Sequence, residues 1–195
     1  MLGLAWRAAA ADLPEEAYLL GEPLVAALNV ALAKARQVAA TQRSDELTVA
    51  ADTLVVADGR ILGKPADARA AADMLHALGG RAHTVLTGVA LSRPDGSAWG
   101  GVVSTAVSMR AVTDAEIDAY VARGEPFDKA GGYAVQGAIF RPVERLDGCY
   151  LNVIGLPLCA VAAGLEALGV SIERPGRMQP PCAYCRLGAD RVTVA

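Results

Sequence analysis

Asp52 is the residue whose type and surroundings most directly predict chemistry. It lies in the run 47–57, which reads as a strand and ends at the turn residues Asp58-Gly59. Because side chains alternate between the two faces of a strand, the carboxylate shares its face with apolar side chains such as Leu54. An ionised carboxylate there is costly unless it is paired, hydrogen-bonded or bound to a metal. The sequence predicts either a functional carboxylate or a structural one satisfied by backbone N–H groups or an arginine.

Lys64 is the second candidate. The turn at Asp58-Gly59 brings the chain back alongside the Asp52 strand, and Gly63 and Pro65 shape the connection around Lys64. We therefore expect its ammonium near the start of that strand or at a neighbouring edge, where a lysine beside a carboxylate suits a phosphate ligand with a bridging cation. The alternative is an exposed loop lysine in a surface ion pair, which contributes little.

The stretch 124–137 is the third candidate, because it is rich in glycine and charge and has no regular period. Gly131-Gly132 allows backbone N–H groups to face an anion, and Gln136 offers a donor and an acceptor suited to a nucleobase edge. The alternative is that Tyr133 and Val135 simply begin a strand.

The elements that must position these residues alternate between helices and strands. Apolar periodicity, caps and turn residues predict helices over 23–40, 68–78, 113–124 and 158–168. Strands are predicted over 47–57, 60–62, 83–92 and 99–109, with a further pair within 138–146. At least two connections are hairpins, so we predict an α/β fold with a mixed sheet flanked by helices.

Composition excludes several classes of protein. The chain has 195 residues, 53% of them hydrophobic, so it is not a disordered regulator. The formal net charge is −3 and no basic stripe is visible, which argues against nucleic-acid binding. No apolar run is long enough to cross a membrane and the first residues do not form a secretory signal, so we expect a cytoplasmic protein. Four cysteines in a chain of this length do not indicate a disulfide scaffold.

Taken in order, the motifs resemble those of the Maf family. They are 51–55 (ADTLV), 62–65 (LGKP), 87–89 (TGV), 124–126 (GEP), 128–131 (DKAG), 136–137 (QG) and 152–158 (NVIGLPL), and the likeness covers about residues 2–170. The resemblance implies a fold shared with the inosine triphosphatase group, with two lobes and a nucleotide cleft between them. It also implies hydrolysis of a nucleoside triphosphate to the monophosphate and pyrophosphate, with Mg²⁺ or Mn²⁺, by a homodimer.

The resemblance also assigns roles to residues of this chain. Asp52 matches the catalytic aspartate, a metal ligand or a base for the attacking water, and Glu15 matches an acidic position that would share the metal. Lys34 and Lys64 match phosphate-binding lysines, and Gln136 matches a glutamine near the nucleotide. In the same loop, the residues expected to bind substrate are Asp128, Lys129 and Gly131. The stretch 133–137 (YAVQG) is closer to the dTTP/UTP branch than to the 7-methyl-GTP branch.

One feature of the family has no counterpart: its opening strand and Ser-x-Ser-Pro-Arg-Arg segment would precede Leu2. Either the start codon is misassigned, which the intact later motifs favour, or the chain is a nucleotide-binding relative with impaired catalysis. We assign residues 1–172 to the Maf-like domain and 173–195 to a tail. The tail carries Cys182 and Cys185, and a solvated pair of thiols is favoured there over half of a zinc site, because no second ligand pair has the required spacing.

Overall fold

A five-stranded sheet forms the centre of the protein. The computed structural model describes residues 4–43 and 45–172, and the strand order within them is β2-β1-β3-β4-β5. The strands are β1 (Thr48–Ala57), β2 (Arg60–Leu62), β3 (Ala82–Ser92), β4 (Ala98–Met109) and β5 (Val143–Asp147). The predicted α/β fold with flanking helices is confirmed. The sheet was expected to be mixed, but all four strand pairings within the described residues are antiparallel.

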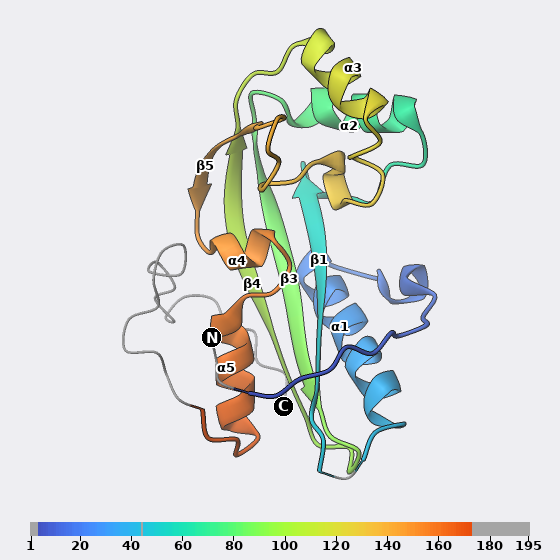
Figure 1. Cartoon of the computed structure of the whole chain (residues 1–195), viewed down its shortest axis with the longest axis vertical. Coiled ribbons are helices and arrows are strands. Elements are labelled where there is room, and N and C mark those ends of the chain that lie inside the picture. The colour runs from blue at the N-terminus through green and yellow to red at the C-terminus, as the bar shows by residue number, and fades with distance from the viewer. Residues whose placement is uncertain (1–3, 44, 173–195) are drawn as a thin grey trace.

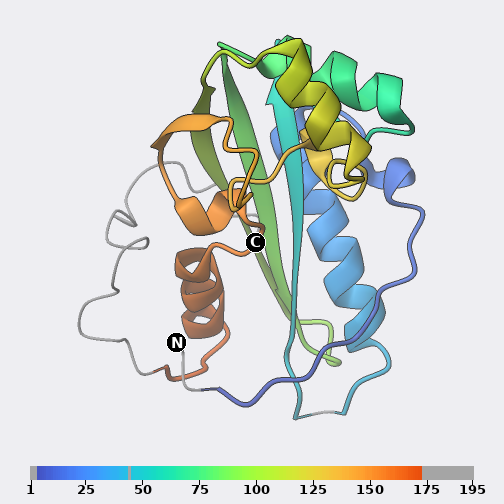
Figure 2. The same ribbon diagram turned by 45° about the horizontal axis from the view of Figure 1, so that its top comes forward.

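Helices lie against both faces and at one end of the sheet. The α-helices are α1 (Pro23–Ala39), α2 (Ala68–Leu78), α3 (Asp114–Ala122), α4 (Tyr150–Val153) and α5 (Leu158–Ala167). Two short 3-10 helices are η1 (Glu15–Tyr18) and η2 (Ala130–Gly132). Figure 1 shows α1 and α5 on opposite faces of the long strands, whereas α2 and α3 lie together at one end of the sheet. The turned view in Figure 2 shows the same grouping.

Local sequence signals account well for the ends of these elements. Asp58 and Gly59 both adopt positive φ, of 50° and 74°, as the tight turn between β1 and β2 requires. The Asp67 side chain accepts a hydrogen bond from the backbone N–H of Ala70 and caps α2. Thr113 and Glu116 form a capping box at the start of α3. These elements therefore begin and end close to the predicted residues.

The region before β5 differs from the prediction. A strand pair was expected within 138–146, but the structure has the single strand β5, paired to β4. Pro142 has no N–H to donate, which prevents regular pairing just before β5, although its carbonyl accepts from the backbone N–H of Arg110. The short helix α4 was not predicted either. No helix within residues 4–43 and 45–172 is long and apolar enough to cross a membrane.

Three apolar groups form most of the core. One joins the sheet to α1 and includes Ala27, Leu28 and Leu54. A second, under α5, includes Leu91 and Leu165. The third lies at the end that carries α2, α3 and η2; its fully or largely buried members are Val55, Leu75, Leu78, Val85, Val107, Met109, Ile117, Tyr120, Tyr133 and Phe140.

Candidate active site

Three charged side chains meet on the α1 face of the sheet. Lys34 Nζ lies 2.7 Å from Asp52 Oδ1 and 2.7 Å from Glu15 Oε1. The three residues, which we call the Lys34 cluster, come from α1, β1 and η1 respectively. The exposed fraction of the side chain falls from 48% for Glu15 to 19% for Lys34 and 12% for Asp52. Asp52 is therefore held in a largely buried position by a lysine rather than by the arginine considered from the sequence.

The helix α1 reaches the sheet closely because its inner face consists of small residues. Ala27, Ala31 and Ala35 are fully buried, and Ala31 and Ala35 pack with Ala90 of β3. Side chains this short let a helix backbone approach the strands, so a lysine on the flank of the helix can extend over the neighbouring strand. The alanine-rich inner face of α1 thus brings Lys34 to Asp52.

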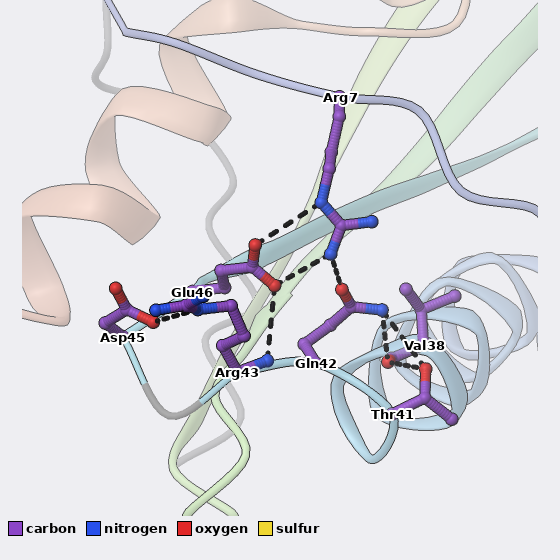
Figure 3. Close-up of polar contacts among 7 residues, drawn as sticks. All are labelled: Arg7, Val38, Thr41, Gln42, Arg43, Asp45 and Glu46. Atoms are coloured by element: carbon purple, nitrogen blue, oxygen red, sulfur yellow. Dashed lines mark hydrogen bonds and ion pairs between the residues drawn. The ribbon is translucent and has the colours of Figure 1, made fainter.

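Glu15 is positioned by the extended segment that precedes η1. Gln37 on α1 clasps this segment: its side-chain oxygen accepts from the backbone N–H of Asp12 at 2.9 Å, and its amide donates to the Asp12 carbonyl at 2.7 Å. Further back, the Arg7 guanidinium lies 2.7 Å from Glu46 Oε2 and also donates to the side chain of Gln42 (Figure 3). These contacts with α1 and with the residues just beyond it hold the segment before η1 in place, and so position Glu15 in the Lys34 cluster.

The electrostatics of the cluster keep Lys34 protonated. Burial by itself disfavours the ammonium, but the hydrogen bonds to Asp52 and Glu15, together with the attraction of both carboxylates, outweigh burial and raise the pKa of Lys34. With both carboxylates ionised, one positive and two negative charges leave the cluster with a net charge of −1. The net negative charge of the cluster attracts a cation.

The donor set of the cluster fits a divalent metal of the kind that accompanies nucleotides. Within the described residues, no three His, Cys, Asp or Glu side chains are grouped so that they alone hold a metal. Mg²⁺ at nucleotide sites usually takes one or two carboxylates and completes its shell with phosphate oxygens and water. Asp52 and Glu15, brought together by Lys34, supply such a pair of carboxylates.

A second group of predicted residues lies where η2 meets the β2–α2 connection. The backbone N–H of Gly131 donates to the carbonyl of Gly63 at 3.0 Å, which places η2 against the residue before Lys64. Lys129 Nζ lies 2.5 Å from Asp128 Oδ1. The hydrogen bond from Lys129 and the nearby Lys64 charge hold the pKa of Asp128 below its usual range. Lys64 itself is exposed, so both lysines offer positive charge at this edge.

The structure therefore divides the predicted site residues into two sets. Glu15, Lys34 and Asp52 are in direct contact, whereas no hydrogen bond or ion pair between described residues joins Lys64 to Asp52. Gly131 packs over Val55, three residues beyond Asp52 on β1, where a Cβ on Gly131 would lie 3.0 Å from Val55 Cγ1. At the strand rise, these positions are about 10 Å apart. Gln136 lies on the same loop and is exposed.

A buried polar network on the opposite face of β1 was not found by the sequence reasoning. The Thr87 hydroxyl donates to the backbone carbonyl of Asn152 at 2.8 Å and lies 2.9 Å from the hydroxyl of Thr53. The amide of Asn152, which is fully buried, donates to Val85 O and to Thr105 Oγ1, each at 2.9 Å. The sequence feature that could have indicated the network is Asn152, a polar residue in the otherwise apolar stretch 152–158. The network fixes α4 to the face of the sheet opposite Asp52.

The Cys182–Cys185 pair and the predicted tail lie outside the described residues. What remains is an α/β protein in which a partly buried lysine bridges Asp52 on the antiparallel sheet and Glu15 on η1. A second lysine-bearing loop lies farther along the strand that carries Asp52. These are the groups with which proteins bind metal-bound phosphates. The fold and site thus define an α/β protein suited to a phosphorylated ligand.

The chain belongs to the family described as Maf-like protein, whose model matches residues 2–168. It is 43% identical over 185 residues to the dTTP/UTP pyrophosphatase of Syntrophotalea carbinolica, covering 94% of this chain and 84% of that relative. It is 46% identical to the dTTP/UTP pyrophosphatase of Moorella thermoacetica, covering 88% of both chains. The dTTP/UTP pyrophosphatase of Geobacter metallireducens is also 46% identical, over 86% of this chain and 87% of its own length.

Proposed function

We propose that this protein is a nucleoside triphosphate pyrophosphatase that converts dTTP or UTP to the monophosphate and pyrophosphate. The observation that carries the proposal is the Lys34 cluster, in which Lys34 joins a largely buried Asp52 to Glu15 through two contacts of 2.7 Å. Support for the substrate class comes from relatives named dTTP/UTP pyrophosphatase that cover most of the chain.

The chemistry assigned to the cluster follows from its charges. Asp52 orients the attacking water and accepts its proton as the water adds to the α-phosphorus. Lys34 stabilises the negative charge that develops on the departing pyrophosphate, and its hydrogen bond to Asp52 holds that carboxylate in place. Lys64, exposed at the edge of the sheet, provides a second positive charge for the phosphates.

A divalent cation, Mg²⁺ or Mn²⁺, completes the proposal. The net charge of −1 on the Lys34 cluster would repel a triphosphate, so a cation between the two is favourable. Asp52 and Glu15 would hold it, and it would supply charge neutralisation for the phosphate oxygens when bound. Calorimetric titration with Mn²⁺ tests these ligands without turnover: Asp52→Asn and Glu15→Gln should each weaken Mn²⁺ binding.

The loop 125–137 is proposed to recognise the nucleotide. Asp128, Lys129 and Gly131 lie together at η2, and Gln136 is exposed on the same loop and free to turn its amide toward a base edge. The likeness of 133–137 to the dTTP/UTP branch supports a pyrimidine. Gln136→Glu should change the ratio of turnover on UTP to turnover on other triphosphates more than it changes turnover on the preferred substrate.

The activity is tested by measuring pyrophosphate and orthophosphate over a panel of triphosphates with Mg²⁺ or Mn²⁺. We expect one pyrophosphate per monophosphate and preference for dTTP or UTP. In water labelled with ¹⁸O, attack on the α-phosphorus places the label in the monophosphate. Label in pyrophosphate, or release of orthophosphate alone, would contradict the proposed reaction. Tight binding without turnover would instead indicate a nucleotide-binding protein.

Two finer proposals concern the assembly and the compartment: the family likeness supports a homodimer, and we propose that the protein acts in the cytoplasm. Sedimentation velocity at several concentrations tests the first, with a species of twice the chain mass expected. Fractionation of cells that produce the protein tests the second.

A further inference from the structure

A buried hydrogen bond joins the sheet to the proposed substrate loop. His83 is on β3, and Tyr133 directly follows η2 on that loop. The His83 Nε2 atom lies 2.6 Å from the Tyr133 hydroxyl, and the two rings meet edge to face with centroids 5.3 Å apart. Both residues are almost fully buried, with exposed fractions of 5% and 6%. The pair spans fifty residues of sequence, so local folding of the loop does not form it.

The His83 and Tyr133 rings depend on each other for a hydrogen bond, because they are buried among apolar side chains. Tyr133 belongs to the apolar group at the α2–α3 end, whose members include Val85 and Val107. Burial lowers the pKa of His83 to about 4 and raises the pKa of Tyr133, so both groups are neutral near pH 7. His83 Nδ1 is buried without a hydrogen-bond partner among the described residues. Tyr133 is therefore the group that satisfies this imidazole, and each ring loses its partner if the other is removed.

Tyr133 lies between the two parts of the loop that are proposed to contact substrate. Before Tyr133, Gly131 and Gly132 have φ of 68° and 71° and form a tight turn. The backbone N–H of Gly132 donates to the carbonyl of Lys129, and the backbone N–H of Gly131 donates to that of Gly63, each at 3.0 Å. After Tyr133, the chain continues to Gln136. Fixing Tyr133 therefore fixes residues on both sides that are proposed to contact substrate.

No other side-chain hydrogen bond between described residues connects the loop 125–137 to a strand of the sheet. The bonds made by Lys129, to the carbonyl of Glu125 and to Asp128, are internal to the loop. The Gly131–Gly63 bond reaches the β2–α2 connection rather than a strand. The His83–Tyr133 bond is thus the side-chain hydrogen bond that attaches the loop to the sheet.

We propose that His83 is a positioning residue: through its buried hydrogen bond to Tyr133 it holds the loop 125–137, with Lys129 and Gln136, in the arrangement that binds the nucleotide. The proposal rests on the proposed function for the identity of the ligand. Its structural half, the attachment of the loop, is measurable on the protein without substrate.

The attachment is tested by hydrogen exchange of the Gly131 and Gly132 amides. Tyr133→Phe removes the hydroxyl and His83→Leu removes the imidazole, and each should speed exchange of these amides about threefold to tenfold, the factor that one lost hydrogen bond corresponds to. Val89→Ala is the matched control, because Val89 is a fully buried residue of the same strand that packs in the apolar group under α5 rather than with Tyr133. It should speed exchange in the core strands and leave the loop amides unchanged.

Kinetics then test the positioning. Tyr133→Phe and His83→Leu should raise KM by a similar factor with little change in kcat, because the loop is proposed to act in binding. His83→Gln should restore KM, since its amide extends to the position of the lost Nε2. Unchanged exchange of the loop in both variants would overturn the proposal, as would faster exchange with KM unchanged. Absence of turnover in the wild type would overturn the proposed function, whereas the exchange experiment would still report on the attachment of the loop.

Discussion

Gly88 of β3 and Ala27 of α1 approach so closely that no side chain fits between them. A Cβ on Gly88 would lie 2.2 Å from the carbonyl oxygen of Ala27. Gly88 is also the residue that pairs directly with Asp52 across β1 and β3. The helix backbone therefore rests on the sheet beside the candidate carboxylate, and two turns farther along α1, Lys34 extends to it. This contact sets the geometry of the site.

Replacing Gly88 by alanine is expected to displace α1. The clash is with backbone atoms, which cannot move aside as a flexible side chain would, so Gly88→Ala should lower the free energy of unfolding by about 3 kcal/mol. Pyrophosphate release should fall as well, because Lys34 moves away from Asp52. Gly63→Ala is the control for stability, since nothing lies within 4 Å of its added Cβ. Equal unfolding free energies for the two variants in urea would refute the account of the contact.

Replacing Lys34 by methionine leaves Asp52 and Glu15 without their shared cation. The variant should be less stable at pH 7 by about 2 kcal/mol, since a partly buried carboxylate loses its partner. Arg36→Met removes an exposed cation from the same helix and should have little effect. Urea unfolding at pH 7 measures both variants, and a Lys34→Met protein as stable as the wild type would contradict this explanation.

Lys64 provides a test of the second group of residues. If its ammonium contacts the phosphates in the transition state, Lys64→Ala should reduce kcat/KM by about 10²-fold or more without loss of stability. Arg60→Ala removes another exposed cation from the same hairpin and serves as the control. Unchanged kinetics in Lys64→Ala would assign Lys64 to the exposed loop lysines that contribute little.

The burial of His83 predicts a specific dependence of stability on pH. Its pKa is lowered from 6.5 to about 4 by burial, so the unfolded chain binds a proton in this interval that the folded protein does not. The contribution of the neutral, buried His83 to the free energy of unfolding is therefore fully present above pH 6.5. It is lost as pH falls toward 4, by about 3 kcal/mol at most. His83→Gln lacks this contribution while keeping the same carboxylates. Parallel curves of unfolding free energy against pH for the two proteins would contradict it.

The parts of the fold that depend on local sequence were predictable. Asp67 and the pair Thr113 and Glu116 cap helices where expected, and Asp58-Gly59 forms the tight turn between β1 and β2. The antiparallel pairing of β1 with β3 was not predictable, because β2 and α2 separate the two strands in the sequence and either direction of return is compatible with that length of chain.

The partners of the site residues depended on contacts between distant elements. Asp52 was recognised as requiring a counter-charge, but the sequence offered Lys64 on the adjacent hairpin as its nearest cation. The structure instead brings Lys34 to Asp52, because the alanine face of α1 packs directly on the sheet. The pairing of His83 with Tyr133 was missed for the same reason, since it joins a strand to a loop fifty residues away.

Turnover by Asp52→Asn tests the central claim most directly. The amide has the size of the carboxylate and can still accept the hydrogen bond from Lys34, but it cannot take a proton from water. Asp58→Asn is the control, since Asp58 is an exposed carboxylate at the end of the same strand whose positive φ suits asparagine. We predict that Asp52→Asn folds normally and loses pyrophosphate release by about 10²-fold or more, while Asp58→Asn retains it. A folded Asp52→Asn protein with wild-type turnover would contradict the account.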